Sequence, residues 1–111
     1  MVLVAQAPPG ICDNGGVHAA ALRFDLHIPQ SQSLKAKRAA IRPIIDGMRH
    51  RFRVSVAETD HQDQWQRAEV GVAVVAESHF MLDEVLGTVT RFVESAPDVE
   101  VLCAETTYLE A

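Results

Sequence analysis

The clearest pattern near the start of the chain is a strict alternation of apolar and polar side chains. It consists of Leu22, Phe24, Leu26 and Ile28, which are separated by Arg23, Asp25 and His27. A period of two is typical of a β-strand with one buried face and one open face. Pro29 ends the pattern, because proline donates no hydrogen bond to a strand ladder. The sequence therefore predicts a strand whose apolar side chains, Phe24 included, lie in the core.

Two longer segments carry apolar side chains at helical spacing. The first follows Ser33, a favoured N-cap residue, and its predicted buried face consists of Leu34, Ile41, Ile44, Ile45, Met48 and Phe52. Pro43 removes one internal hydrogen bond, so we expect it to bend this helix. The second follows Ser78 and ends before Pro97, with an apolar face of Met81, Leu82, Val85, Leu86, Val89, Phe92, Val93 and Ala96.

Three further strands complete the pattern. Alternating valines predict strands at residues 54–57 and 70–74, joined as a hairpin, and residues 99–108 form the last strand. The order strand-helix-strand-strand-helix-strand, βαββαβ, predicts an α+β fold of the ferredoxin-like split βαβ class. In that fold a four-stranded antiparallel sheet carries both helices on one face. The other face is open, and Arg23, Asp25, His27, Glu69, Gly71, Ala73 and Val75 are expected on it.

Composition favours a single cytoplasmic domain. The 111 residues carry a net charge of −5 and are 48% hydrophobic, as in an ordinary globular protein. Residues 1–16 are rich in proline and glycine and are expected to be a flexible N-terminal extension, with one domain at residues 17–111. Neither a signal peptide nor a transmembrane segment is expected. Cys12 and Cys103 lie far apart without a metal-binding motif, which favours a reducing cytosol.

Positive charge is concentrated in the first predicted helix. Seven of the ten Lys and Arg residues fall between Lys35 and Arg53. Cations in the first helical turn oppose the helix dipole at a cost of roughly 0.3–1 kcal/mol each, so another interaction must favour them there. Free N–H groups, a hydroxyl and mobile cations are the components of a phosphate site. The candidate anion contacts are Ser33, Lys35, Lys37, Arg38 and Arg42.

A second interpretation of this positive charge stays open. Charged helix faces are usually solvated and paired with acids of the same protein. Arg49, His50 and Arg51 lie near the end of the helix, where cations complement the dipole, so they need no external anion.

Other chemistry is weakly indicated. Asp60, His61 and Asp63 offer metal ligands, with His27 in reach, but a zinc site needs three or four ligands in fixed geometry. Turn hydrogen bonds, with Trp65 packed across the hairpin, are the simpler interpretation. No catalytic or cofactor-binding motif is present, so no enzymatic activity and no cofactor are expected. The strands lack the aromatic residues with which RRM domains stack bases. Cys103 is expected in a buried strand.

Several separated sequence blocks occur together in a recognisable order. They are SLKAKR at 33–38, RFRVSVAE at 51–58, DHQD at 60–63, WQRAEVGVAVV at 65–75, RFVE at 91–94 and PDVE at 97–100. Over about residues 17–106 the chain resembles the YlxP-like family, a bacterial domain-of-unknown-function family. The resemblance implies a small cytoplasmic ferredoxin-like protein. Genes of this family often neighbour those for translation initiation and ribosome maturation factors, which suggests an association with ribosomal RNA or the small subunit. It supplies no catalytic residues.

Three hypotheses follow for the function. The first is a non-enzymatic accessory protein that binds structured RNA or a ribosomal subunit through backbone phosphates. The second is a homo-oligomeric interaction module that uses the open sheet face or an edge strand. The third is a metal-dependent enzyme centred on Asp60, His61 and Asp63.

Overall fold

The computed structural model describes residues 17–109, which form four strands and two helices. The extension expected at residues 1–16, with Cys12, lies outside the described residues. In chain order the elements are β1 (His18–His27), α1 (Leu34–Phe52), β2 (Ser55–Asp60), β3 (Arg67–Ala76), α2 (His79–Glu94) and β4 (Glu100–Tyr108).

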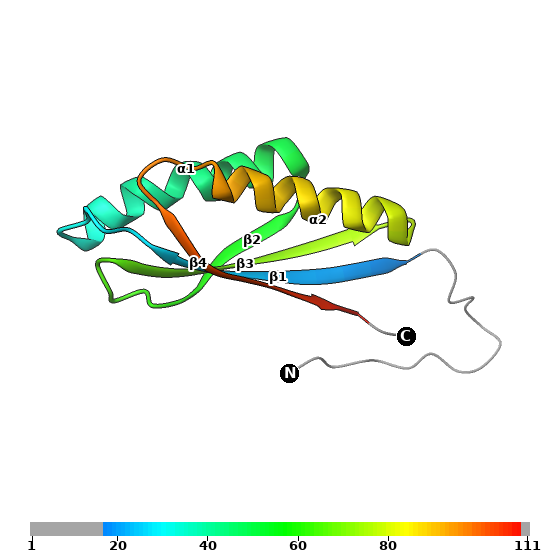
Figure 1. The fold of residues 1–111 in the computed structure, drawn as a ribbon, viewed down its shortest axis with the longest axis horizontal. Coiled ribbons are helices and arrows are strands. Elements are labelled where there is room, and N and C mark those ends of the chain that lie inside the picture. The colour runs from blue at the N-terminus through cyan, green and yellow to red at the C-terminus, as the bar shows by residue number, and fades with distance from the viewer. Residues whose placement is uncertain (1–16, 110–111) are drawn as a thin grey trace.

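The strands form one antiparallel sheet in the order β2-β3-β1-β4. Both helices cover the same face of this sheet (Figure 1). The fold class predicted from the sequence is therefore confirmed. β1 and β3 are each ten residues long and pair from end to end, so both extend beyond the segments that alternation marks. No helix within residues 17–109 is long and apolar enough to span a bilayer.

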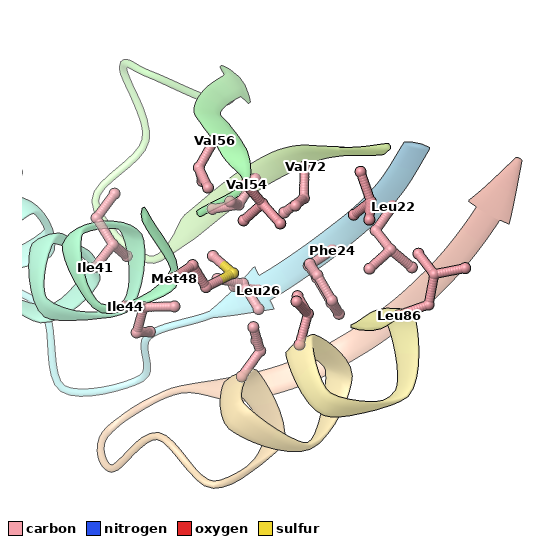
Figure 2. Packing of buried hydrophobic residues seen from close by; sticks show 14 of the residues in the cluster. Leu22, Phe24, Leu26, Ile41, Ile44, Met48, Val54, Val56, Val72 and Leu86 are labelled. Atoms are coloured by element: carbon pink, nitrogen blue, oxygen red, sulfur yellow. The ribbon is translucent and has the colours of Figure 1, made fainter. Parts of the chain in front are cut away.

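The core lies between the sheet and the two helices. On β1 the alternation is confirmed, since Leu22, Phe24 and Leu26 are buried, Phe24 completely. Figure 2 shows these side chains together with Met48 of α1 and Leu86 of α2. Apolar area removed from water contributes about 25 cal/mol per Å², so this layer is the main source of stability. The buried apolar set also includes Ile28, Ile41, Ile44, Val54, Val56, Val70, Val72, Val74, Leu82, Val89 and Val93.

Both predicted N-caps are present. The Ser33 hydroxyl accepts a hydrogen bond from Ala36 N at 3.0 Å, and the Ser78 hydroxyl accepts one from Met81 N at 3.1 Å. Each satisfies one of the backbone donors that a helix start leaves free. α1 continues through Pro43 as a single helix to Phe52.

Some positions expected in the core are exposed. Cys103 is exposed because β4 is an edge strand, and its partner on β1 is Asp25 of the open face. Trp65, expected to pack across the hairpin, is 55% exposed, and Met81 is 42% exposed at the first turn of α2. Ala96 lies beyond the end of α2 but is partly buried against the core, as expected. Local alternation and helical period define a face, but they do not show how far the neighbouring layer extends over it.

Candidate anion-binding surface on the first helix

The buried stripe of α1 contains a lysine. Its members are Lys37, Ile41, Ile44 and Met48, and the Lys37 residue is 0% exposed. Position 37 precedes the three apolar residues by four, seven and eleven, the spacing of one helix face. That spacing was the sequence signal for its burial.

The ammonium group of Lys37 is satisfied inside the protein. Its Nζ donates hydrogen bonds to the carbonyl oxygens of His61 at 2.7 Å, Gln62 at 3.3 Å and Arg67 at 3.2 Å. These contacts use all three donors of a lysine ammonium. The Glu58 carboxylate lies 3.1 Å from Nζ and balances the charge. The prediction that Lys37 contacts an external anion is therefore wrong.

Ser33 has a structural role as well. Its Oγ caps α1, and its carbonyl oxygen accepts bonds from Lys37 N and from the Ser31 hydroxyl, at 3.0 Å each. The polar atoms of this turn therefore bind one another.

Three of the candidate cations project outward from α1. Lys35, Arg38 and Arg42 are exposed, and no ion pair or side-chain hydrogen bond joins any of them to another residue within 17–109. Arg38 and Arg42 line a shallow groove of about 270 Å³ between α1 and the edge of β2. The other residues lining this groove are Ile41, Ile45, Asp46, Arg49, Ala57 and Glu58.

Two other cations of α1 have partners. Arg49 donates to the carbonyl oxygen of Val56 at 2.6 Å and lies 3.9 Å from Asp46. The Arg51 guanidinium lies over the Phe92 ring, 5.2 Å from its centre. Pairing within the protein therefore explains Lys37, Arg49 and Arg51, but not the exposed set of Lys35, Arg38 and Arg42, which we call the α1 cation cluster.

The loop between β2 and β3 does not assemble the suggested metal ligands. Asp60 Oδ1 accepts a bond from His61 N at 2.7 Å, as in a turn, and Asp63 is exposed. The His61 ring lies toward the sheet, with Nε2 3.6 Å from Asp25 Oδ1. In the part of the chain that the structure describes, no three His, Cys, Asp or Glu side chains are arranged to hold a metal ion.

The open sheet face carries a charged network that is paired within the subunit. Arg23 lies 3.2 Å from Glu69, 3.3 Å from Asp25 and 3.5 Å from Glu105. The hydrogen bond to Glu69, helped by the charge of Glu105, raises the pKa of the Arg23 guanidinium. Beside this network is an open groove of about 550 Å³, whose floor is made of small residues: Ala21, Ser55, Ala57, Gly71 and Ala73.

Three solved structures show a limited similarity to this chain over most of its length. The de novo designed protein Foldit4 has a TM-score of 0.47 and 17% identity, with 82% of this chain and 96% of that chain covered. The designed protein LFR1 1 with ferredoxin fold has a TM-score of 0.46 and 11% identity, covering 82% of each chain. A C-terminal segment of the alpha subunit of aIF2 from Pyrococcus abyssi has a TM-score of 0.44 and 17% identity. The similarity covers 86% of this chain and 51% of that chain.

Sequence comparison gives a family. The chain is 38% identical over 68 residues to the uncharacterized protein YlxP of Bacillus subtilis (strain 168), covering 61% of this chain and 74% of that protein. Residues 19–106 match the family described as "Protein of unknown function (DUF503)". Because this match spans most of the chain, the protein belongs to the DUF503 family.

Proposed function

We propose that this protein is a non-enzymatic accessory factor that binds structured RNA, as in a ribosomal subunit, through contacts of the α1 cation cluster with backbone phosphates. The observation that carries the proposal is that Lys35, Arg38 and Arg42 are exposed and have no ion-pair partner within residues 17–109. They lie on a protein whose net charge is −5. Guanidinium and ammonium groups form strong, charge-assisted hydrogen bonds with phosphate oxygens.

Recognition of this kind depends on charge and not on base sequence. Phosphate contacts position a protein on nucleic acid, whereas contacts with base edges specify sequence. The α1 cation cluster contains no aromatic side chain on which a base would stack. We therefore expect binding to depend strongly on salt and weakly on sequence, with structured RNA preferred because it presents phosphates at fixed spacing.

The test compares Arg38→Gln, Arg42→Gln and the double variant with the wild type. Binding to an RNA hairpin and to a single strand of equal length is measured by fluorescence anisotropy over a range of salt concentrations. Each lost phosphate contact is expected to lower the slope of log K against log salt by about 0.7–0.9. The double variant should therefore lose about twice as much slope as either single variant.

Arg91→Gln is the matched control. It removes the same charge from an exposed position on α2, where the Arg91 side chain hydrogen-bonds to Thr88 Oγ1 at 3.3 Å and forms no ion pair within residues 17–109. If the control lowers the salt slope as much as Arg42→Gln does, binding reflects overall charge. If neither α1 variant changes affinity or slope, α1 is not the RNA-binding surface.

A further inference from the structure

The two edges of the sheet differ in whether side chains of the same subunit bind their outward backbone groups. β2 and β4 are the edge strands. On β2, the outward carbonyl of Val56 accepts a bond from Arg49 Nη2 at 2.6 Å, and that of Glu58 accepts one from Gln62 Nε2 at 3.3 Å. Side chains that occupy outward backbone groups prevent an edge strand from pairing with another chain. The β2 edge is therefore protected by its own subunit.

The β4 edge lacks this protection. Every residue of β4 except Val101 is exposed, and within residues 17–109 no side chain hydrogen-bonds to its backbone. Large apolar side chains also accompany this edge, since Leu102 is 52% exposed, Tyr108 42% and Leu109 51%. A long exposed edge with apolar side chains is a template for strand pairing.

The outward groups of β4 follow from one hydrogen bond. Leu109 N donates to Ala19 O of β1 at 2.8 Å, so the backbone of residue 109 faces β1. Backbone direction alternates along an antiparallel strand. Residues 107, 105 and 103 therefore also face β1, whereas the N–H and C=O groups of Ala104, Thr106 and Tyr108 face outward.

We propose that β4 pairs antiparallel with β4 of a second copy of this chain, with Thr106 directly opposite Thr106 of that copy. In this register Ala104 lies opposite Tyr108 of the second copy, and Tyr108 lies opposite Ala104 of the second copy. The three outward residues of each strand then exchange six backbone hydrogen bonds across the two-fold axis. This interface uses neither α1 nor the open face, so it goes beyond the proposed RNA binding and fails independently of it.

Charge favours one register of this pairing. With Thr106 on the axis, Glu105 lies opposite Thr107 of the second copy, and the two threonines at the axis form a favourable cross-strand pair. Moving the two-fold axis by one residue, from Thr106 to Glu105, places Glu105 opposite its own symmetry mate, which is unfavourable because like charges face each other. Moving the axis further toward the start of β4 would bring the residues near Leu102 into the interface, where the β1–β4 register changes and the strand is irregular. A second copy thus satisfies the outward groups without opposing charges.

The first test is the oligomeric state of the full chain, measured by sedimentation equilibrium over a dilution series. The wild type and Thr106→Val, which keeps the backbone donor and the side-chain shape, are expected to be dimers at high concentration. Thr106→Pro removes a donor that faces outward in the monomer, and proline is tolerated at such edge positions. It should remain folded by circular dichroism and be monomeric where the wild type is dimeric. A wild type that stays monomeric up to about 1 mM would overturn the proposal, because a Kd above that concentration corresponds to a binding free energy of less than ~4 kcal/mol.

The second test reads the register and does not depend on the proline variant. Both native cysteines, Cys12 and Cys103, are replaced by serine, and Thr106→Cys or Glu105→Cys is added. Opposite residues of a hydrogen-bonded pair lie about 5.5 Å apart between Cα atoms, within the range that a disulfide spans. Oxidation should link Thr106→Cys into a covalent dimer and leave Glu105→Cys mostly unlinked. Preferential linking of Glu105→Cys, or of neither variant, contradicts the proposed pairing.

Discussion

A lysine near the start of a helix lies close to the positive end of the helix dipole, so it needs a specific partner to be favourable there. For Lys37 that partner is the β2–β3 loop with the start of β3, because the carbonyl groups of His61, Gln62 and Arg67 accept hydrogen bonds from the ammonium. A loop that turns its carbonyls inward needs a donor, because buried unpaired carbonyls are costly. Lys37 therefore connects α1 to the hairpin and fixes the shape of the loop.

This role predicts a large loss of stability for Lys37→Met. Methionine fills similar volume but leaves three carbonyls and the Glu58 carboxylate without their cation. Breaking one side of a buried ion pair costs about 3–5 kcal/mol. Urea denaturation followed by circular dichroism should show a loss of that size. Lys35→Met, two positions away on the exposed side, should change the free energy of unfolding by less than about 0.5 kcal/mol. Equal effects of the two variants would show that the buried contacts contribute little.

The single residues show where sequence reasoning reaches its limit. Phe24 was correctly placed in the core, because a strand's alternation identifies its inward side. Lys37 was misplaced because residue type suggested exposure, although its helical spacing matched the buried stripe. The partners of Lys37 come from the β2–β3 loop and the first residue of β3, 24–30 positions away, and no local pattern predicts carbonyl direction at that distance.

Among the elements, the contact of α1 with α2 depends on a glycine. A Cβ atom at Gly47 would lie 2.6 Å from Cζ of Phe92, whose ring packs edge-on against Phe52 with centres 5.4 Å apart. The Arg51 guanidinium also lies over the Phe92 ring, 5.2 Å from its centre, so Phe92 packs against two side chains of α1. Gly47 lowers helix propensity, and the close approach of the two helices explains why it occurs in mid-helix.

Two glycine variants test this packing with opposite expected signs. Helix propensity alone favours Gly→Ala by about 0.8–1 kcal/mol in either helix. At Gly87 the new Cβ would meet only the end of the flexible Arg91 side chain, at 3.3 Å, so Gly87→Ala should stabilise the protein. Gly47→Ala should destabilise it, because overpacking costs about 1–3 kcal/mol. Thermal or urea denaturation of both variants gives the comparison, and stabilisation by both would mean that Phe92 moves aside freely.

Element order was fully predictable, whereas strand environment was not. Short runs of alternating apolar and polar residues, together with two capped helices, were enough to predict the order βαββαβ. The residues of β4 do not indicate that the strand is exposed along almost its whole length. Its exposure depends on the position of α2 over the sheet, which is a tertiary feature. The exposure of Cys103 follows from this geometry.

For the whole molecule, charge is distributed unevenly. Residues 35–53 contain seven Lys or Arg and one acid, while the remaining residues contain three and fourteen. On the open face Arg23 is shared by three carboxylates, those of Asp25, Glu69 and Glu105, whereas the α1 cation cluster has no ion-pair partner within residues 17–109. Such separation directs an anionic partner to one side of the molecule.

The two proposed surfaces together predict bivalent binding. Pairing β4 strands in one sheet requires a two-fold axis perpendicular to the sheet, so the helices of both copies lie on the same side. α1 packs beside β2, which is the edge strand at the end of the sheet away from β4. Seven strand spacings of about 4.8 Å separate the two β2 edges, or roughly 34 Å.

An RNA long enough to reach both clusters should therefore bind the dimer more tightly than a short hairpin does, since the second contact is intramolecular. Thr106→Pro should weaken binding of the long RNA by about 100-fold or more and leave the Kd of the short hairpin unchanged. Anisotropy titrations with both RNAs, at protein concentrations where the wild type is dimeric, measure this difference. Equal loss for both RNAs would point to damage at α1. An unchanged affinity for the long RNA would show that it does not bind both clusters at once, because an RNA that bridges the two copies binds more weakly when the dimer is lost.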